Sequence, residues 1–212
     1  MTSIALPNSL TSITSSAFES CSSLASISLP AGISSIEDYT FYGCGKLKSF
    51  SLPTNLTNIG YGAFVYCPLT SLTIPNKVVS IGDLAFYDCT GLTNFYFQGN
   101  AATLGGTNVF LNVNAAAVVY YLPGTTNWSA TYGGLPTVML TPQIAGANSG
   151  VSTNGFGFAI NGAAGMVVVV EASADLINWQ PMLTNTLSGT TFNFSDPQWT
   201  NYPGRYYRLR SP

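Results

Sequence analysis

Cysteine is the residue type in this chain with the widest choice of chemistry. Four cysteines recur at intervals of 23, 23 and 22 residues, at Cys21, Cys44, Cys67 and Cys89. Four thiols can form two disulfides or bind a metal, but a zinc site usually combines cysteine and histidine at short spacing, and this chain contains no histidine. The even spacing instead predicts one thiol in each of four successive structural units. We expect a ladder of buried free thiols that behave as small apolar side chains and hold no metal.

The remaining reactive groups argue against an enzyme. Without histidine, no Ser-His or Cys-His nucleophile pair can form, and the commonest general base near neutral pH is missing. Five carboxylates fall near the cysteines, where an acidic residue usually caps a turn or faces solvent: Glu19, Glu37, Asp38, Asp83 and Asp88. The glycine pairs lack the lysine and the strand-to-helix context of a phosphate-binding loop. The sequence therefore predicts no catalytic residues and no cofactor.

The elements that carry the cysteines repeat with them. Proline recurs at the same spacing, at Pro7, Pro30, Pro53 and Pro75, and phenylalanine recurs at Phe18, Phe41, Phe64 and Phe86. A fixed period in the twenties is typical of a solenoid, in which each coil buries its apolar side chains against its neighbours. The short alternating run Leu-x-x-Ile-x-Leu before each proline predicts a half-buried strand. The run Ala-Phe-x-x-Cys predicts a short helical or irregular turn on the opposite wall.

This combined signature resembles the BspA-type leucine-rich repeat of bacterial surface proteins. The resemblance covers roughly residues 1–99 and is carried by copies such as Leu24 to Pro30 and Leu69 to Pro75. It implies surface display and adhesion to host, matrix or polysaccharide. A degenerate fifth coil follows, in which residues 117–123 restore the strand while the cysteine is lost.

Two domains are expected, because the composition changes near Pro142. Residues 1–140 should form a leucine-rich repeat solenoid of about five coils of 22–25 residues, mainly β with short helical turns and a degenerate closing repeat. Residues 143–212 contain short apolar runs at about ten-residue spacing, which predicts a small β-sandwich. The segments Val170 to Trp179 and Arg205 to Arg208 resemble the fibronectin-like module that ends many large secreted bacterial proteins. That resemblance implies a surface or secretion-associated tail without catalytic residues.

Charge and hydropathy restrict the partners. Only 7% of the residues are charged and the net charge is −2, so the chain lacks the positive charge that nucleic-acid binding requires. The longest unbroken apolar stretch, residues 115–122, is far shorter than the roughly 20 residues of a membrane span. The chain opens inside a repeat, without a cap or a signal peptide. We interpret it as a truncated or partial sequence of an extracellular or cell-surface protein.

Two surfaces are candidates for binding. On the strand side, outward positions carry small polar residues, with aromatic residues in the last coils. The residues expected to bind ligand are Lys48, Ser49, Thr70, Thr73, Thr93, Tyr96 and Tyr121. The alternative is a solvated sheet face without a ligand. On the opposite wall, tyrosines gather near the phenylalanine and cysteine positions, at Tyr39, Tyr42, Tyr61, Tyr66 and Tyr87. These rings either cover the core or form an exposed aromatic surface that binds partners.

The sequence therefore predicts an extracellular, non-catalytic adhesion protein that presents a rigid solenoid face to protein or polysaccharide ligands. A structural role is the alternative, in which the chain assembles through an uncapped solenoid end. The first coil, with a strand from Ile4 to Leu6, has no preceding coil to cover its apolar side chains. Because an open strand edge promotes association, we also expect self-association through the N-terminal coil, or fraying of that coil.

Overall fold

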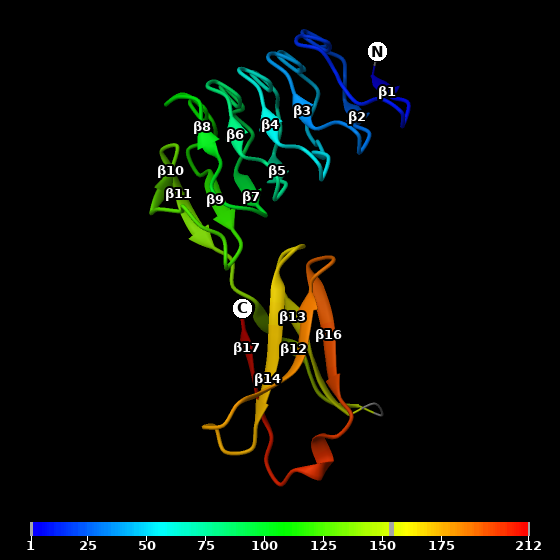
Figure 1. Cartoon of the computed structure of the whole chain (residues 1–212), viewed down its shortest axis with the longest axis vertical. Helices are drawn as coiled ribbons and strands as arrows, with labels where there is room; N and C mark the ends of the chain where they lie inside the picture. Colours follow the sequence, from blue (N-terminus) through cyan, green and yellow to red (C-terminus); the bar gives the residue numbers. More distant parts are fainter. Residues whose placement is uncertain (1, 153–154, 212) are drawn as a thin grey trace. The chain divides into compact units, whose positions relative to one another are not determined.

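The computed structural model describes residues 2–152 and 155–211 and divides into two compact units (Figure 1). The first unit contains Met1–Tyr121 and Thr125–Val138, and the second contains Leu122–Gly124 and Met139–Pro212. Nearly all regular structure is β, and the only helix within the described residues is the 3-10 helix η1 (Trp199–Asn201). The predicted solenoid is confirmed in the first unit, where strands of successive coils pair in parallel.

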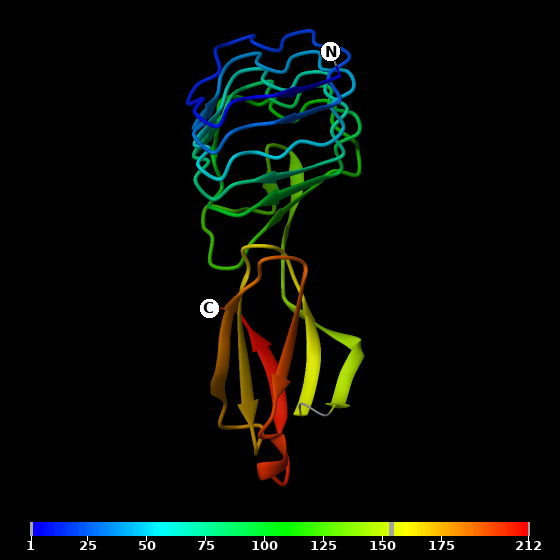
Figure 2. The same cartoon turned by 90° about the vertical axis from the view of Figure 1, so that its right-hand side faces the viewer.

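Successive coils of the first unit stack with their strands side by side (Figure 2). One side carries the strands of the Leu-x-x-Ile-x-Leu runs, which are β1 (Ser3–Ala5), β2 (Ser26–Ser28), β5 (Ser71–Ile74), β7 (Asn94–Phe97) and β9 (Val118–Tyr121). The hairpin of β10 (Thr131–Tyr132) and β11 (Leu135–Met139) completes a sheet in the order β10-β11-β9-β7-β5. A second row of short parallel strands contains β3 (Ser35–Ile36), β4 (Asn58–Ile59), β6 (Ser80–Ile81) and β8 (Thr103–Leu104).

A column of stacked phenylalanine rings forms the centre of the solenoid. The ring centroids lie 5.4 Å apart for Phe18 and Phe41, 5.4 Å for Phe41 and Phe64, 5.6 Å for Phe64 and Phe86, and 5.8 Å for Phe86 and Phe110. The three middle rings have no exposed surface. Each of the three middle rings stacks between a ring of the preceding coil and a ring of the next coil, so the sequence period becomes a continuous core.

The wall opposite the strands consists of irregular turns, which is one of the two forms that the sequence leaves open, and the helical form is not adopted in the described residues. We call the segments 15–21, 38–44, 61–67 and 83–89 the turn wall. In the second coil, Tyr39 and Gly43 have φ angles of 56° and 70°, which a right-handed helix cannot contain. Alternate N–H groups donate to the next coil instead, as from Phe41 to the Ala63 carbonyl (2.9 Å). Hydrogen bonds between coils therefore hold this wall together.

The third copy of the strand motif, residues 47–52, departs from the pattern. Its neighbours β2 and β5 belong to separate sheets, and the described part of the chain contains no ladder that joins residues 49–51 to either strand. Phe50 occupies the inward position of this copy and packs edge-on against Phe41 (5.0 Å between centroids) and Phe64 (5.2 Å). Phe50 thus anchors the strand segment of the third coil, whose described backbone is linked to an adjacent coil only by the hydrogen bond from the Thr70 N–H to the Lys48 carbonyl (3.2 Å).

The second unit contains two three-stranded antiparallel sheets. One sheet has the order β12-β13-β16, with β12 (Gln143–Ser152), β13 (Gly155–Asn161) and β16 (Thr191–Asp196). The other has the order β15-β14-β17, with β15 (Gln180–Thr186), β14 (Val167–Ser173) and β17 (Tyr206–Arg210). Apolar residues of both sheets share one core, among them Phe158, Ile160, Val168, Val170 and Phe194. Two sheets that share a core form the layered arrangement of small all-β domains.

Candidate functional site

The strand register decides which side chains reach the strand face, which we define as the outward side chains of β2, residues 49–51, β5, β7 and β9. The buried column across β5, β7 and β9 contains Leu72, Phe95 and Val119. The outward column beside it contains Thr73, Tyr96 and Tyr120. The rings of Tyr96 and Tyr120 stack with centroids 5.2 Å apart and an interplanar angle of 18°. The strand face therefore includes a partly exposed pair of aromatic rings.

Tyr121 does not belong to the strand face, so this part of the site prediction is wrong. Tyr121 pairs in register with Phe97 on the inward side of β7, and its ring stacks on Trp128 with centroids 4.9 Å apart. Successive side chains of a strand point to opposite faces, so a one-residue difference moves a ring from one face to the other. Tyr120, which sequence reasoning missed, takes the outward position because it pairs with Tyr96.

The other residues expected to bind ligand lie on the strand face or beside it. Four of them are exposed, namely Lys48, Ser49, Thr70 and Thr73. Two are partly exposed, namely Thr93 and Tyr96. The Thr93 backbone N–H and its hydroxyl both donate to the Thr70 carbonyl, at 3.0 and 3.3 Å. Thr93 is therefore engaged in linking two coils, whereas Ser49 and Thr73 present their hydroxyls to solvent.

A hollow of about 520 Å³ opens on the strand face around the unpaired third-coil strand. Its lining is dominated by hydroxyl side chains of the second, third and fourth coils, which are Ser26, Ser28, Ser49, Ser51, Thr54, Ser71 and Thr73. Each hydroxyl can both donate and accept a hydrogen bond. Within the described residues, the backbone groups of residues 49–51 also lack partners in adjacent coils. The hollow thus concentrates uncharged hydrogen-bonding groups, which suit a ligand rich in amides or hydroxyls.

The cysteines form a ladder beside the phenylalanine column. All four are free thiols, and three are buried, whereas Cys21 is partly exposed. Each buried thiol donates a hydrogen bond to the phenylalanine carbonyl of the preceding coil: Cys44 to Phe18 (3.2 Å), Cys67 to Phe41 (3.1 Å) and Cys89 to Phe64 (3.0 Å). Burial raises the pKa of the Cys89 thiol to about 12, so this group stays protonated at neutral pH. These bonds between coils were missed by sequence reasoning, which treated the thiols only as small apolar groups.

Thiol labelling should separate Cys21 from the three buried cysteines. In native protein near neutral pH, a maleimide reagent should modify Cys21 first, because labelling needs an accessible thiolate and Cys44, Cys67 and Cys89 are buried. All four should react after denaturation, as counted by mass spectrometry. Reducing agent should leave the melting temperature unchanged. Rapid native labelling of Cys67, or a lower melting temperature after reduction, would contradict this assignment.

Ion pairs organise the second unit. Asp196 is 1% exposed and accepts a hydrogen bond from Arg205 Nε at 2.6 Å. Glu171 accepts hydrogen bonds from Arg208 Nε (2.6 Å) and Arg210 Nε (3.0 Å), and the Arg208 bond is the main cause of its lowered pKa. Both carboxylates are held by arginine side chains within the second unit. Their role is therefore structural.

The described ranges contain no group of three or more side chains able to hold a metal ion. Among the same residues, no helix has the length and apolar character needed to cross a membrane.

Comparison with known proteins gives matches that cover the first unit. A family model described as BspA type leucine rich repeat region matches residues 1–117 in 6 copies. The crystal structure of a T. pallidum leucine-rich repeat protein (TpLRR) is similar, with a TM-score of 0.51 and 28% identity, over 56% of this chain and 58% of that one. A leucine-rich repeat protein from Bacteroides ovatus ATCC 8483 gives a TM-score of 0.45 and 27% identity, over 57% of this chain and 39% of that one. This chain thus spans less than two thirds of either structure, and no curated protein matches it.

Proposed function

Because the chain belongs to the BspA-type leucine-rich repeat family, we propose that it is an extracellular, non-catalytic adhesion protein that binds a protein ligand on its strand face. The leucine-rich repeat fold indicates a role in protein interaction. The observation that carries the more specific proposal is the hydroxyl-lined hollow, which interrupts the strand face where residues 49–51 lack ladder bonds. Small side chains leave this part of the face open to a ligand.

An extended protein segment matches the chemistry of the hollow. Such a segment presents one N–H and one C=O group per residue, and these groups need partners when they leave water. The hollow supplies serine and threonine hydroxyls, together with the backbone groups of residues 49–51. Because the stacked core holds the coils in place, few side chains would have to be ordered on binding, which favours affinity. Adhesion would then arise from several weak contacts along one rigid face.

Blocking the hollow should abolish retention of the ligand. Ser51→Arg places a long charged side chain in the hollow without touching the core, and we expect at least a tenfold loss of binding to any matrix protein that the parent binds, about 1.4 kcal/mol. The measurement is surface plasmon resonance on a panel of immobilised extracellular-matrix proteins. Thr107→Arg, exposed in the fifth coil outside the hollow, is the matched control and should bind like the parent. Equal loss in both variants, or none in Ser51→Arg, would contradict the proposal.

A polysaccharide is the second candidate ligand, and the stacked pair of Tyr96 and Tyr120 favours it. Tyrosine combines an apolar ring with a polar tip, which suits a sugar surface. If a polysaccharide binds, replacing both rings by alanine should remove retention on that polysaccharide while circular dichroism shows an unchanged fold. Binding to matrix proteins that survives this double change would favour the protein ligand. A parent that binds nothing on either panel would favour the structural alternative of self-association.

We also propose that the second unit is a fibronectin-like β-sandwich that acts as a surface or secretion-associated module. Support comes from its two antiparallel sheets with a shared core and from the arginine-rich strand β17. We further propose domains at residues 1–140 and 143–212. The division of the chain into two compact units supports this proposal, although the second unit also contains Leu122–Gly124 and begins at Met139.

A further inference from the structure

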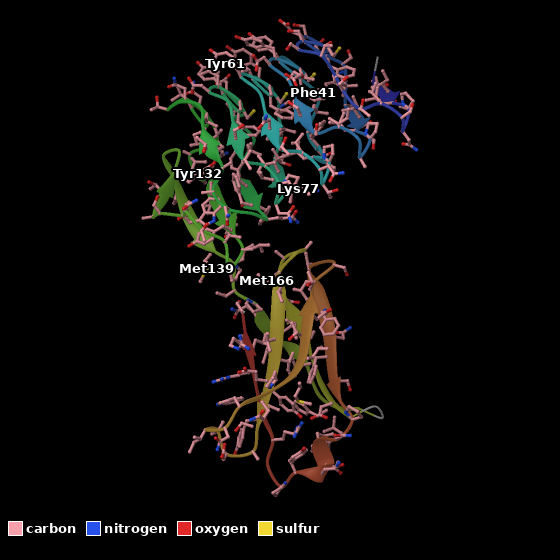
Figure 3. The ribbon with its side chains drawn as sticks, viewed as in Figure 1. Phe41, Tyr61, Lys77, Tyr132, Met139 and Met166 are labelled. Atoms are coloured by element: carbon pink, nitrogen blue, oxygen red, sulfur yellow. The ribbon has the colours of Figure 1, made fainter. Side chains whose placement is uncertain are left out.

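The turn wall carries an exposed row of tyrosines that the core does not require. Three of the rings are substantially exposed, Tyr39 and Tyr61 at 38% each and Tyr66 at 47%. The rings meet edge to face across three coils, with centroids 5.3 Å apart for Tyr39 and Tyr61, 5.6 Å for Tyr42 and Tyr66, and 6.0 Å for Tyr66 and Tyr87. The phenylalanine column already closes the interior beneath them. The row is therefore a continuous aromatic surface, distinct from the strand face (Figure 3 labels Tyr61 on this wall and Phe41 among the coils).

Carboxylates accompany the rings. A hollow of about 600 Å³ is lined by Glu19 together with four tyrosines, Tyr39, Tyr42, Tyr66 and Tyr87. A second hollow, of about 630 Å³, contains Tyr61 among its lining residues and has three acidic residues, Glu37, Asp38 and Asp83. Asp88 acts electrostatically on Tyr66. The turn-wall segments contain no lysine or arginine. Five of the eight acidic residues of the chain therefore lie on or beside this one wall.

Some of these carboxylates have a structural task and others do not. Asp38 Oδ1 accepts a hydrogen bond from the Tyr61 backbone N–H (2.7 Å), and Asp83 Oδ1 accepts one from the Asn108 backbone N–H (2.9 Å). In contrast, the side chains of Glu19, Glu37 and Asp88 have no hydrogen bond or ion pair within residues 2–152 and 155–211. Three negative charges thus remain uncompensated next to the exposed rings.

Together, the rings and the charges define the chemistry of a partner. The face of a tyrosine ring attracts a cation, arginine most often, because a guanidinium can stack on the ring. Carboxylates beside the ring add an ionic contact for the same group. Partial burial raises the pKa of Tyr39 and Tyr66, and the neighbouring charges add to this effect, so both rings keep a neutral hydroxyl that can donate. The surface extends over several coils, which exceeds the reach of a single small cation.

We propose that the turn wall is a docking surface for an arginine-rich segment of a partner protein. The segment lies along the coils, with guanidinium groups over the rings of Tyr39 and Tyr66 and paired with Glu19, Glu37 and Asp88. This binding is independent of the strand face, and loss of one activity leaves the other intact.

The test uses fluorescein-labelled nona-arginine and nona-lysine, with binding to the full chain followed by fluorescence anisotropy. The parent should bind nona-arginine more tightly than nona-lysine, and more weakly at about 300 mM than at about 50 mM salt. Each of Tyr39→Ala and Tyr66→Ala should weaken nona-arginine binding about two- to fivefold, the usual size of an exposed cation–π contact. Tyr206→Ala is the matched control, since Tyr206 is 46% exposed in the second unit, and it should bind like the parent.

The aromatic and ionic contributions can be separated if an alanine variant loses its fold. Tyr39→Phe and Tyr66→Phe keep the rings and should retain binding, whereas Glu19→Gln and Asp88→Asn should weaken it. The Ser51→Arg variant, altered on the strand face, should still bind nona-arginine. Failure of the parent to bind at low salt would overturn the proposal. The proposal would also be overturned if a double Tyr39→Ala, Tyr66→Ala variant, shown to be folded by circular dichroism, bound nona-arginine as tightly as the parent. Net charge alone would then explain the attraction.

Discussion

Phe64→Ala should lower the free energy of unfolding of the solenoid by about 3–5 kcal/mol, the usual cost of truncating a buried aromatic side chain. Phe64 has no exposed surface and stacks between Phe41 and Phe86, with centroids 5.4 and 5.6 Å away. Phe50 adds an edge contact at 5.2 Å. The substitution opens a cavity in the middle of the column, where no chain end can move in to fill it. Urea unfolding, followed by hydrogen exchange of the first unit, measures the loss.

Ser49→Ala is the control for this prediction, because Ser49 is exposed on the strand face. It should change the free energy of unfolding by less than about 0.5 kcal/mol. Phe18→Ala should cost less than Phe64→Ala, since Phe18 is 8% exposed and, among the described residues, stacks only on Phe41. Similar losses for Ser49→Ala and Phe64→Ala would refute the assignment of inward and outward residues.

Asp196→Ala should destabilise the second unit by about 3–5 kcal/mol, because removing one partner of a buried ion pair leaves the other charge uncompensated. Asp196 is 1% exposed, and its Oδ2 accepts hydrogen bonds from Arg205 Nε (2.6 Å) and the Tyr207 hydroxyl (2.9 Å). Its Oδ1 accepts the Gln198 backbone N–H at 2.9 Å. Urea unfolding followed by hydrogen exchange of the second unit measures the loss.

A double-mutant cycle tests the cause of that loss. When Arg205 is also replaced, by methionine, no charge is left unpaired, and the double variant should be more stable than Asp196→Ala alone. The matched surface control is Glu19→Ala, an exposed carboxylate without an ion pair among the described residues, which should leave the stability of the second unit unchanged. An Asp196→Ala variant within about 0.5 kcal/mol of the parent would show that the ion pair contributes little.

The period of proline, phenylalanine and cysteine was sufficient to predict the solenoid. Residues that recur at one spacing occupy one place in successive coils, so burial of Phe41 implies burial of Phe64 and Phe86. The same reasoning placed Ser49 and Thr73 on the exposed strand face. Periodicity predicts equivalence between coils, and these assignments need nothing else.

Features that depend on register or on backbone conformation could not be predicted in this way. Tyr120 and Tyr121 are adjacent, and only the pairing with Tyr96 and Phe97 shows which ring faces outward. The positive φ angle of Tyr39 has no signature in its residue type, since tyrosine rarely adopts it. The missing ladder at residues 49–51 is a departure of one coil from the repeat, which a repeat pattern cannot reveal.

The hydrogen bonds between coils also determine how the solenoid responds to mechanical tension. They join each coil to the next along the array, as from the Phe41 N–H to the Ala63 carbonyl, so a pull along the array stretches them directly. Bonds loaded in this direction separate one row at a time, unlike strands in shear, which must break many at once. Each coil of 23 residues that peels away releases at most roughly 76–83 Å of extended chain. Under such tension the array would lengthen stepwise, and the force along it would stay limited while coils remain to be released.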